Sequence, residues 1–512
     1  MKNDKPVLPH SPFLPFPHSP FPLLLPFSAV AALLFWQLGA LTFVDPDLWH
    51  EMALFREALA LGHLPFADQF AYTPTVYPSV QHEWGTGAVL YFLATRFGST
   101  GILVAKYLLT LGVVGLGMAA ARRRGAGWPV IVSLAPLAIL CGVIGYTTIR
   151  AQLFTLLFIA LLLYSLELDR AGLRRWIWAW LPLYTVWLNL HAGFIVGLGF
   201  VAGHAGEQWL RGQPYKHLLG VAAAMIALVA VNPYGLAYYG YLAHALSMPR
   251  PLITEWAPLW STDPAMFRMF LVTLLIVAYC AANLGWRRLP GLIVLSLAAY
   301  AAARHTRHLS IYLVVWQCYA PSYVQQTPLG RWLGEFWSGR RNLVAGVSAA
   351  CGLLCLVGAL AAAPWQLRLP VTLDAEREGK PVYPVGAVEY LSRTQFRGNL
   401  MVPFIPGGYV IWKLHPRVRV SLDGRYEVAY QKGVLEENTA LYEAQAGWQE
   451  TLTRYPTDAV LVARSAPLAE ALTTVPGWRR IYRDEAFELF ARSGLNLPEE
   501  DRTGQIPQPQ FP

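Results

Sequence analysis

The chain has 512 residues, of which 55% are hydrophobic and only 14% are charged. An average soluble domain carries roughly 25% charged residues, so this chain has too few charges to cover the surface of a soluble protein of its size. The composition also excludes a disordered chain, a collagen-like chain and a secreted disulfide scaffold. It favours a polytopic membrane protein, in which the net charge of +9 reflects basic loops rather than a nucleic-acid partner.

The chain opens with a proline-rich segment. Residues 1–20 include the repeated letters HSPF and are too rich in proline to form a helix. We therefore expect a disordered cytoplasmic tail at residues 1–20. The apolar run at 21–44 is too long for the core of a signal peptide and lacks a small-residue cleavage site, which predicts a retained first span.

Ten further apolar runs approach the roughly 17–25 residues that cross a bilayer, which brings the predicted total to about eleven spans. They lie at residues 100–121, 128–147, 151–168, 176–190, 193–210, 217–231, 266–284, 289–302, 306–321 and 342–363. Residues 85–98 are too few for a span, and we expect an interfacial or re-entrant helix there.

One orientation accounts for the main basic clusters of this region. If the N-terminus is cytoplasmic, clusters such as residues 122–124 and 287–288 all fall in cytoplasmic loops, as the positive-inside rule requires. The same orientation places loop 45–85 and the C-terminal residues outside. The sequence thus predicts a multi-pass protein of the cell inner membrane with an extracytoplasmic C-terminal domain.

The composition changes after residue 364. The preceding residues contain 13 of the 31 acidic residues, and the last 148 residues contain the other 18. Short β-like runs alternate there with helical patterns, which predicts a small α/β domain at 365–495 and a disordered polar tail at 496–512. The predicted strands are 399–404, 417–422, 459–463 and 487–490, and the predicted helices are 385–393, 433–444 and 468–474. The predicted fold class is mostly α: a transmembrane helical domain at 21–364, followed by the small α/β domain.

The first external loop, residues 45–85, concentrates acidic side chains. Six of the 13 acidic residues of the membrane region fall within 39 positions of it. Carboxylates at a membrane boundary are costly to desolvate and tend to mark function. Asp45 and Asp47 flank a stiff proline, so the pair can hold a divalent cation such as Mg²⁺ or Mn²⁺, or supply a general base. Capping of a helix that begins near Leu48 is the alternative for either residue alone.

Other candidate residues lie at the predicted external ends of spans. His50, His82 and Glu83 can add ligands or bases from both ends of the loop. Phosphate binding requires cations, and five candidates emerge at the external edge. They are Arg150, Arg304, His305, Arg307 and His308. Ordinary interfacial snorkelling is the alternative for these cations.

Three further residues are weaker candidates. His191 lies between two predicted spans, where a lone histidine is more often a satisfied polar residue than a ligand. Glu255 can face the same cavity, although the tryptophans beside it also suit interface anchors. For Asp423, in the segment SLDGR, a turn is favoured over contact with an acceptor.

Several motifs resemble those of GT-C superfamily membrane glycosyltransferases, in particular bacterial multi-spanning proteins with a DPDLWWH-like start to the first loop. The matching segments are DPDLWHEM from Asp45, HEW from His82, RAQLF from Arg150, NLHAGF from Asn189, NPYG from Asn232, EWAPL from Glu255 and GGYVIWKLHPRVRVSLDGR from Gly407. The second Trp of the relatives' WWH is missing here, and FADQFAYT replaces their TDPFSYT-like run. The resemblance covers most of residues 40–490.

The resemblance implies transfer of a sugar from a polyprenyl-phosphate carrier on the extracytoplasmic side. It places the catalytic acidic residue at the start of the first external loop, which matches Asp47 first and Asp45 second as the base. Glu83, with His82, is the expected partner that binds acceptor or metal. The acceptor, whether glycan, lipid or protein, is left open, and so is metal dependence.

Other functions compete with this interpretation. An O-antigen ligase or polymerase would depend more on arginines than on first-loop carboxylates. A transporter or flippase would carry charges within its spans and internal repeats, neither of which stands out here. A non-catalytic relative with an interaction module at its C-terminus is the third alternative.

Overall fold

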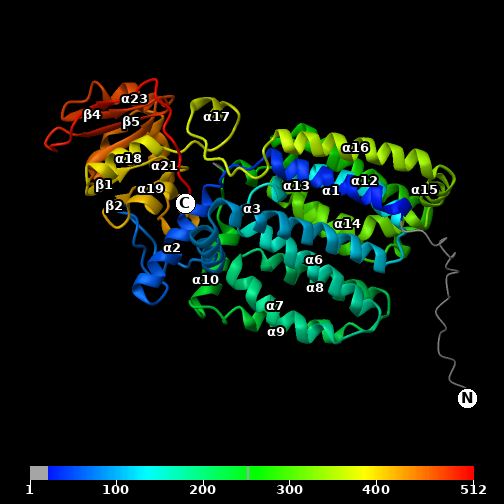
Figure 1. The fold of residues 1–512 in the computed structure, drawn as a ribbon. Coiled ribbons are helices and arrows are strands. Elements are labelled where there is room, and N and C mark those ends of the chain that lie inside the picture. The colour runs from blue at the N-terminus through cyan, green and yellow to red at the C-terminus, as the bar shows by residue number, and fades with distance from the viewer. Residues whose placement is uncertain (1–20, 251–252) are drawn as a thin grey trace, which may run out of the picture.

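The computed structural model describes residues 21–250 and 253–512, so the predicted tail at 1–20 lies outside the described residues. A bundle of long helices forms one part of the molecule, and a smaller part with a β-sheet lies at one end of the bundle (Figure 1). This architecture confirms the predicted fold class of a helical domain followed by a small α/β domain.

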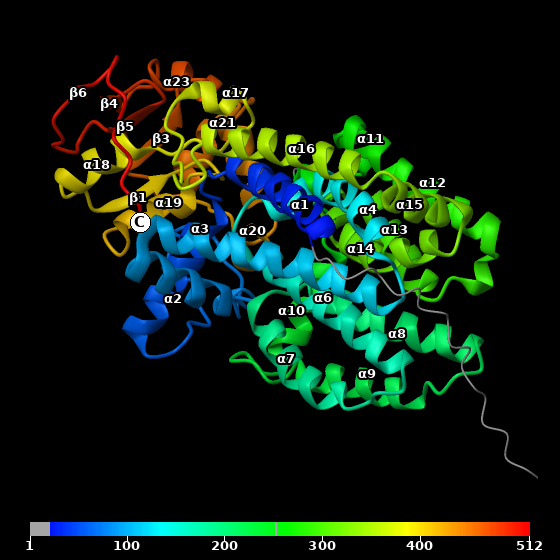
Figure 2. The ribbon, with the colours of Figure 1, turned by 45° about the vertical axis from the view of Figure 1, so that its right-hand side comes forward.

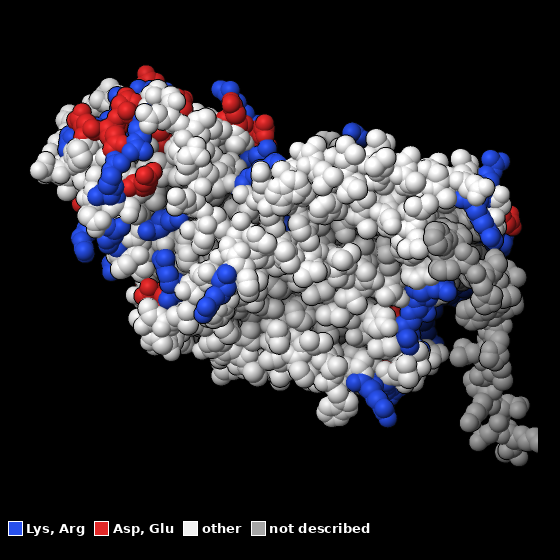
Figure 3. Space-filling model, viewed as in Figure 1, with Lys and Arg blue, Asp and Glu red and all other residues white. Residues whose placement is uncertain are grey.

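Each of the eleven predicted spans coincides with a helix. These helices are α1 (Phe21–Ala40), α3 (Trp84–Arg123), α4 (Trp128–Cys141), α6 (Ala151–Arg170), α7 (Trp176–Leu190), α8 (Phe194–Leu210), α9 (Lys216–Leu228), α12 (Pro264–Leu284), α13 (Leu292–Arg304), α14 (Leu309–Gln325) and α16 (Arg341–Ala361). Of the described helices, α1, α3, α6, α12 and α16 are long and apolar enough to cross a membrane. Between the two ends of the molecule, the face in Figure 3 is almost free of charged side chains, as expected of a surface in contact with lipid.

Helix α3 combines two predicted segments. It is 40 residues long and breaks at Gly98, whose φ of 59° and ψ of −148° lie outside the helical region and suit glycine. The break falls between predicted segments 85–98 and 100–121. The first half of α3 lies against the sheet end of the molecule, and the second half continues into the bundle (Figure 2).

Helix α14 is the centre of the bundle. Its residues from Leu309 to Val324 are all buried, and it packs against α3, α4, α6 and α13. Helices α1 and α16 lie side by side on one flank of the bundle (Figures 1 and 2). The small connecting helices are α5 (Val143–Tyr146), α10 (Ala237–Ser247), α11 (Leu259–Thr262) and α15 (Pro328–Gly339).

Ion pairs are buried at the bundle end farther from the sheet. Arg124 Nη1 lies 2.5 Å from Glu167 Oε1, and Arg170 bonds both Glu167 and Glu207. The Gly291 amide donates to both oxygens of Glu207 at 2.8 Å. Each of these charges is paired with one of opposite sign, so we interpret the network as a structural link between helix ends.

The C-terminal domain is built on a six-stranded mixed sheet with the order β2-β1-β3-β5-β4-β6. Its strands are β1 (Gly398–Met401), β2 (Val418–Val420), β3 (Ala459–Ala463), β4 (Trp478–Arg483), β5 (Phe487–Arg492) and β6 (Glu500–Asp501). Strand β1 runs parallel to β2 and β3, and β5 runs antiparallel to β3 and β4. The domain's helices are α17 (Leu373–Arg377), α18 (Val385–Arg393), α19 (Gly407–Leu414), α20 (Tyr426–Ala429), α21 (Val434–Tyr442), α22 (Gln449–Arg454) and α23 (Pro467–Leu472).

Residues 496–512 differ from the predicted disordered tail. Strand β6 pairs with β4, and the Tyr390 hydroxyl donates to the Pro498 carbonyl at 2.5 Å. Near the end of the chain, the Phe511 ring lies 5.6 Å from that of Trp49. The segment is ordered because backbone groups and one aromatic ring hold it, and its polar composition gives no sign of such contacts.

The first loop is structurally part of the C-terminal domain. It contains helix α2 (Asp47–Leu61), which packs between α3 and α19. Farther along the loop, the Tyr72 amide donates to the Val420 carbonyl at 3.1 Å, and the Val420 amide donates to the Phe70 carbonyl at 2.9 Å. The loop therefore extends the sheet beside β2.

A buried arginine closes the contact between loop and domain. Arg425 Nη2 lies 2.7 Å from Asp423 Oδ2, and Arg425 Nη1 lies 2.5 Å from Asp68 Oδ2 in the loop. The Tyr430 hydroxyl adds a 2.6 Å hydrogen bond to Asp423, and the guanidinium stacks on Phe70 at 4.8 Å. Burial alone would raise the pKa of Asp423, but Arg425 outweighs it and lowers that pKa to about 2.

We expect Arg425→Gln to destabilise the protein strongly, because it leaves two buried carboxylates without a cation. Removal of one partner from a buried ion pair costs about 3–5 kcal/mol. Thermal unfolding of the detergent-solubilised protein measures the loss. Arg419→Gln is the matched control, since Arg419 lies on β2 with an exposed side chain and should leave the midpoint almost unchanged. Equal midpoints for both variants would contradict the assigned role of Arg425.

Candidate active site

Helix α2 places the first-loop residues at the junction of the two domains. Trp49 is fully buried and packs edge-on against Tyr383 and Tyr409, with ring centroids 5.9 and 5.0 Å away. The Arg56 guanidinium stacks on Trp412 at 4.4 Å and donates to its carbonyl at 2.7 Å. These contacts fix α2 on the C-terminal domain and so fix the direction of its polar side chains.

Two glycines allow close approach to α2. A Cβ atom on Gly87 of α3 would lie only 2.3 Å from the Glu51 carbonyl oxygen, so the two helices touch through their backbones. A Cβ on Gly424 would lie 3.0 Å from His50 Cε1 and 3.2 Å from Asp47 Oδ1. The turn at Asp423, which the Arg425 amide completes by donating to Asp423 Oδ1 at 2.9 Å, therefore covers the start of α2.

The predicted pair of aspartates lies at the N-terminus of α2. Asp45 is 7% exposed, and its Oδ1 accepts a 3.1 Å hydrogen bond from the Asp47 amide. Asp47 is half-buried, and among the described residues its carboxylate accepts no hydrogen bond. The helix-capping alternative thus explains one contact of Asp45 and leaves the Asp47 carboxylate unexplained.

Burial shifts the protonation of these carboxylates. It raises the pKa of Asp45, although nearby Arg150 opposes the shift. It raises the pKa of Asp47 further, and the neighbouring charge of Asp45 adds to the effect. Glu51, 3% exposed, also has a strongly raised pKa because of burial and the nearby Glu83 carboxylate.

Glu83 gathers two of the predicted histidines. Its Oε1 lies 3.3 Å from His82 Nε2 and 3.4 Å from His191 Nε2. Burial alone would raise the pKa of Glu83, but the histidines outweigh it and lower that pKa. Glu83 lies just before α3, at the end of the first loop. Its contact with His191 therefore places this end of the loop at the junction of α7 and α8.

The second ring nitrogen of each of these histidines contacts a hydroxyl group. His82 Nδ1 is 2.8 Å from the Tyr241 hydroxyl, and His191 Nδ1 is 2.7 Å from Thr155 Oγ1. Burial lowers the pKa of His191 to about 3, although the Glu83 carboxylate opposes the shift. Both ring nitrogens of His191 thus have a partner, as the predicted satisfied polar residue requires, and one of those partners is Glu83.

Cationic groups lie beside the aspartates. Arg150 precedes α6 and pairs with Glu255 at 2.8 Å. Burial alone would lower the pKa of Arg150, but Glu255, Asp45 and Asp47 raise it, so its charge is permanent. Both Arg150 and Glu255 were predicted from sequence, and the structure brings them together.

Most of the predicted cationic cluster surrounds Trp256. Arg307 stacks on the Trp256 ring at 4.6 Å, and His305 Nδ1 lies 2.6 Å from the Trp256 carbonyl oxygen. The His308 ring centroid is 5.9 Å from that of Trp256, and burial lowers the pKa of His308 to about 4. Arg304, at the end of α13, is exposed and forms no hydrogen bond or ion pair with the described residues. It lies apart from the cluster.

Sequence reasoning missed three contributors to the site. Glu51 lies one helical turn after Asp47 and was counted among the loop's acidic residues without a role. Asp423 was interpreted as a turn residue, and the turn exists, but its ion pair with Arg425 links it to the loop. For Trp256, the role of an interface anchor was left open as an alternative. Only the four-residue spacing from Asp47 to Glu51 was available as a signal in the sequence.

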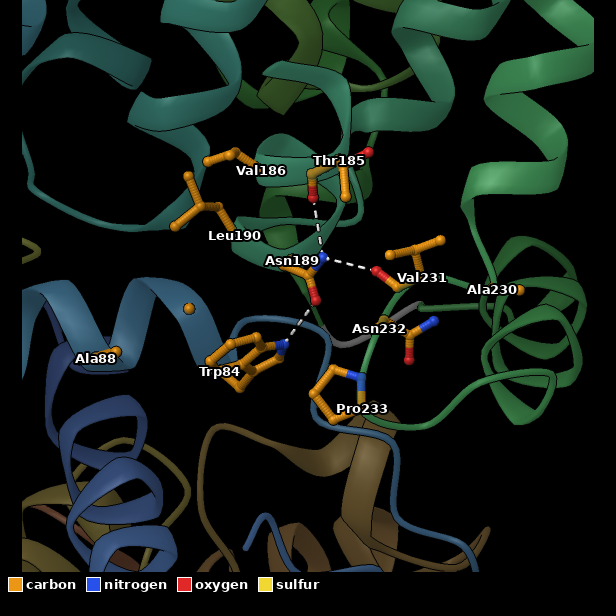
Figure 4. A pocket seen from close by; sticks show the side chains of 11 residues that line it. Trp84, Ala88, Thr185, Val186, Asn189, Leu190, Ala230, Val231, Asn232 and Pro233 are labelled. Carbon is orange, nitrogen blue, oxygen red and sulfur yellow. Dashed lines mark hydrogen bonds between the residues drawn. The ribbon is translucent and has the colours of Figure 1, made fainter. Parts of the chain in front are cut away.

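An apolar groove of about 700 Å³ is lined by residues of α3, of α7 and of the connection between α9 and α10 (Figure 4). Its lining includes Trp84, which follows Glu83, and Leu190, which precedes His191. Asn189 closes one wall by accepting a 3.1 Å hydrogen bond from Trp84 Nε1 and donating to the Thr185 and Val231 carbonyls. The groove is therefore mostly apolar, and two of its lining residues adjoin residues of the polar site in sequence.

No protein-family model matches the chain, and no curated protein matches its sequence. Solved structures do match. ArnT from Cupriavidus metallidurans, solved bound to undecaprenyl phosphate, aligns with a TM-score of 0.54 at 14% identity over 92% of this chain and 98% of its own. Arabinofuranosyltransferase AftD from Mycobacteria aligns with a TM-score of 0.54 at 15% identity over 94% of this chain and 40% of its own.

The chain has the GT-C fold. At these identities the likeness establishes the fold alone, since one fold can host different activities. The GT-C fold and the long apolar helices together make this a membrane-embedded protein. In this fold, the first loop, the helix junctions and the C-terminal domain meet at the polar site described above.

We expect Gly87→Ala to destabilise the protein, because the added Cβ would lie 2.3 Å from the Glu51 carbonyl oxygen and force α2 away from α3. Gly115→Ala, in the same helix with nothing within 4 Å of the added atom, is the control. An alanine there should be neutral or stabilise by up to about 1 kcal/mol. Thermal unfolding of both solubilised variants compares them, and an unchanged midpoint for Gly87→Ala would contradict the close packing.

Proposed function

We propose that the protein is a membrane glycosyltransferase that moves a sugar from a polyprenyl-phosphate-linked donor to an acceptor outside the cytoplasm. The observation that carries the proposal is the half-buried Asp47 carboxylate, which lies at the junction of the two domains with the Arg150 charge close by. The GT-C fold and the undecaprenyl phosphate bound to ArnT support the class of donor.

Asp47 suits the role of general base better than Asp45. A base must accept a proton from the acceptor hydroxyl, and it works best when its pKa approaches the working pH. Burial and the Asp45 charge raise the pKa of Asp47, and its carboxylate has no competing hydrogen bond among the described residues. Asp45, in contrast, already accepts the Asp47 amide.

The leaving phosphate would find cations beside the base. As the bond to the sugar breaks, negative charge develops on the phosphate oxygens, and fixed cations stabilise that charge. Arg150 lies close enough to Asp45 and Asp47 to shift their pKa values, and Arg307 is close enough to Glu255 to help lower the pKa of that carboxyl. Trp256 orients the Arg307 guanidinium by stacking.

The apolar groove supports a lipid-linked donor. Its walls carry few polar groups, and its lining residues Trp84 and Leu190 are the sequence neighbours of Glu83 and His191 (Figure 4). A polyprenyl chain in the groove would leave its phosphate near the polar site, at the boundary between apolar and polar surfaces. Glu83, held between two histidines, is then placed to bind the acceptor.

Asp47→Asn should reduce sugar transfer by about 10²–10⁴-fold, because an amide cannot accept the proton of the acceptor. Membranes that contain the variant are assayed with radiolabelled polyprenyl-phosphate sugars, beside Asp45→Asn and the control Asp374→Asn, whose side chain is 83% exposed. Full transfer by both first-loop variants would refute the base assignment. It would favour a ligase-like reaction that depends on arginines instead.

The proposed orientation has its own test. An alkaline phosphatase reporter fused after Pro364 should be active, because it would lie outside the cytoplasm, whereas a fusion after Arg288 should be inactive. The basic residues near Arg288 favour the cytoplasmic side by the positive-inside rule. The reverse pattern of activities would place the candidate site on the cytoplasmic side.

A further inference from the structure

Three side chains near the base converge on one point. Ligand atoms of His50 and Glu51 on α2, and of Glu83 before α3, all lie within 4.8 Å of one another. Ligands about 2.0–2.2 Å from a common metal lie up to about 4.4 Å apart, so small side-chain movements bring this group into coordination. The predicted metal pair, Asp45 and Asp47, does not belong to it.

A second observation points to a missing partner. Both carboxyl oxygens of Glu51 and Nδ1 of His50 are buried without a hydrogen-bond partner among the residues that the structure describes. Glu51 is 3% exposed and His50 is 6% exposed. Native proteins rarely leave buried polar atoms unpaired, because each unpaired group keeps its full cost of desolvation. The two side chains are therefore positioned for a ligand that supplies the contacts they lack.

We propose that His50, Glu51 and Glu83 bind a divalent transition-metal ion that links α2 to the start of α3. Two carboxylates and one imidazole suit Mn²⁺ or Zn²⁺, because imidazole favours transition metals over Ca²⁺. The ion would neutralise two carboxylates that otherwise repel each other. His82 and His191 both lie within 3.4 Å of Glu83 Oε1. They would orient the Glu83 carboxylate without binding the metal themselves.

Such an ion would position the catalytic helix. Glu51 lies one turn after Asp47 on α2, so a metal held by Glu51 and Glu83 would fix the rotation of the helix that carries the base. The inference does not depend on the transferase reaction, because metal binding can be measured without substrate.

The purified, solubilised full chain is stripped with EDTA, then equilibrated with Mn²⁺ or Zn²⁺ and desalted. We expect about one ion per chain by mass spectrometry and a rise of about 3 °C or more in the unfolding midpoint for one of the metals. Glu51→Gln and Glu83→Gln should each weaken binding at least about tenfold and lose the rise in midpoint. Glu57→Gln is the control, because Glu57 lies on α2 but pairs with His415 at 3.1 Å, and it should bind metal like the unaltered chain.

Two results would overturn the proposal. One is an unaltered chain that binds neither ion, in which case Glu51 and Glu83 share a proton instead. The other is Glu51→Gln and Glu83→Gln variants that bind metal as well as the unaltered chain does. Midpoints in EDTA show whether each variant folds. If both fail to fold, the stripped His50→Gln variant is tested in the same way, and an undiminished metal-induced rise in its midpoint would overturn the proposal.

Discussion

The charge network of Arg425, Asp423 and Asp68 is the constraint on which the arrangement of the site depends. A single buried guanidinium binds one carboxylate from the C-terminal domain and one from the first loop. Because a buried cation must keep its partners, the loop cannot leave the domain without a large electrostatic cost. The network fixes the turn that carries Gly424 against His50 and Asp47. The position of the proposed base thus depends on residues far from it in the chain.

The fold could be predicted where it depends on local composition. Span length and hydropathy located every long helix of the bundle, and alternating patterns located β1, β2, β3 and β5. Strand β4 was missed because WRRIYR carries three arginines, and β6 because it consists of only two residues, both acidic. The order of the last residues was missed for the same reason, since neither backbone pairing nor the contact of Phe511 leaves a pattern in the sequence.

The site could be predicted where unusual polar residues interrupt apolar sequence. Asp45, Asp47, His82, Glu83 and Arg150 stand at the ends of helices and do gather in space. The side chains that these residues contact within the site could not be predicted. The contact of Glu83 with His191 depends on how α3 meets α7, and the approach of Glu51 to Glu83 depends on a glycine contact between helices. Arg304 was included because it belongs to the run of cationic residues where a span emerges, but it is exposed at the end of α13.

The long reach of the α2 contacts has a consequence for synthesis. Arg56 bonds a carbonyl 356 positions later in the chain, and Asp68 bonds a residue 357 positions later. A growing chain therefore completes its helical bundle while α2 still lacks the surface that covers Trp49. Only when the ribosome has passed residue 425 can the first loop take its final position. A product truncated before residue 425 therefore has no assembled site, because the first loop lacks the residues that hold it in place.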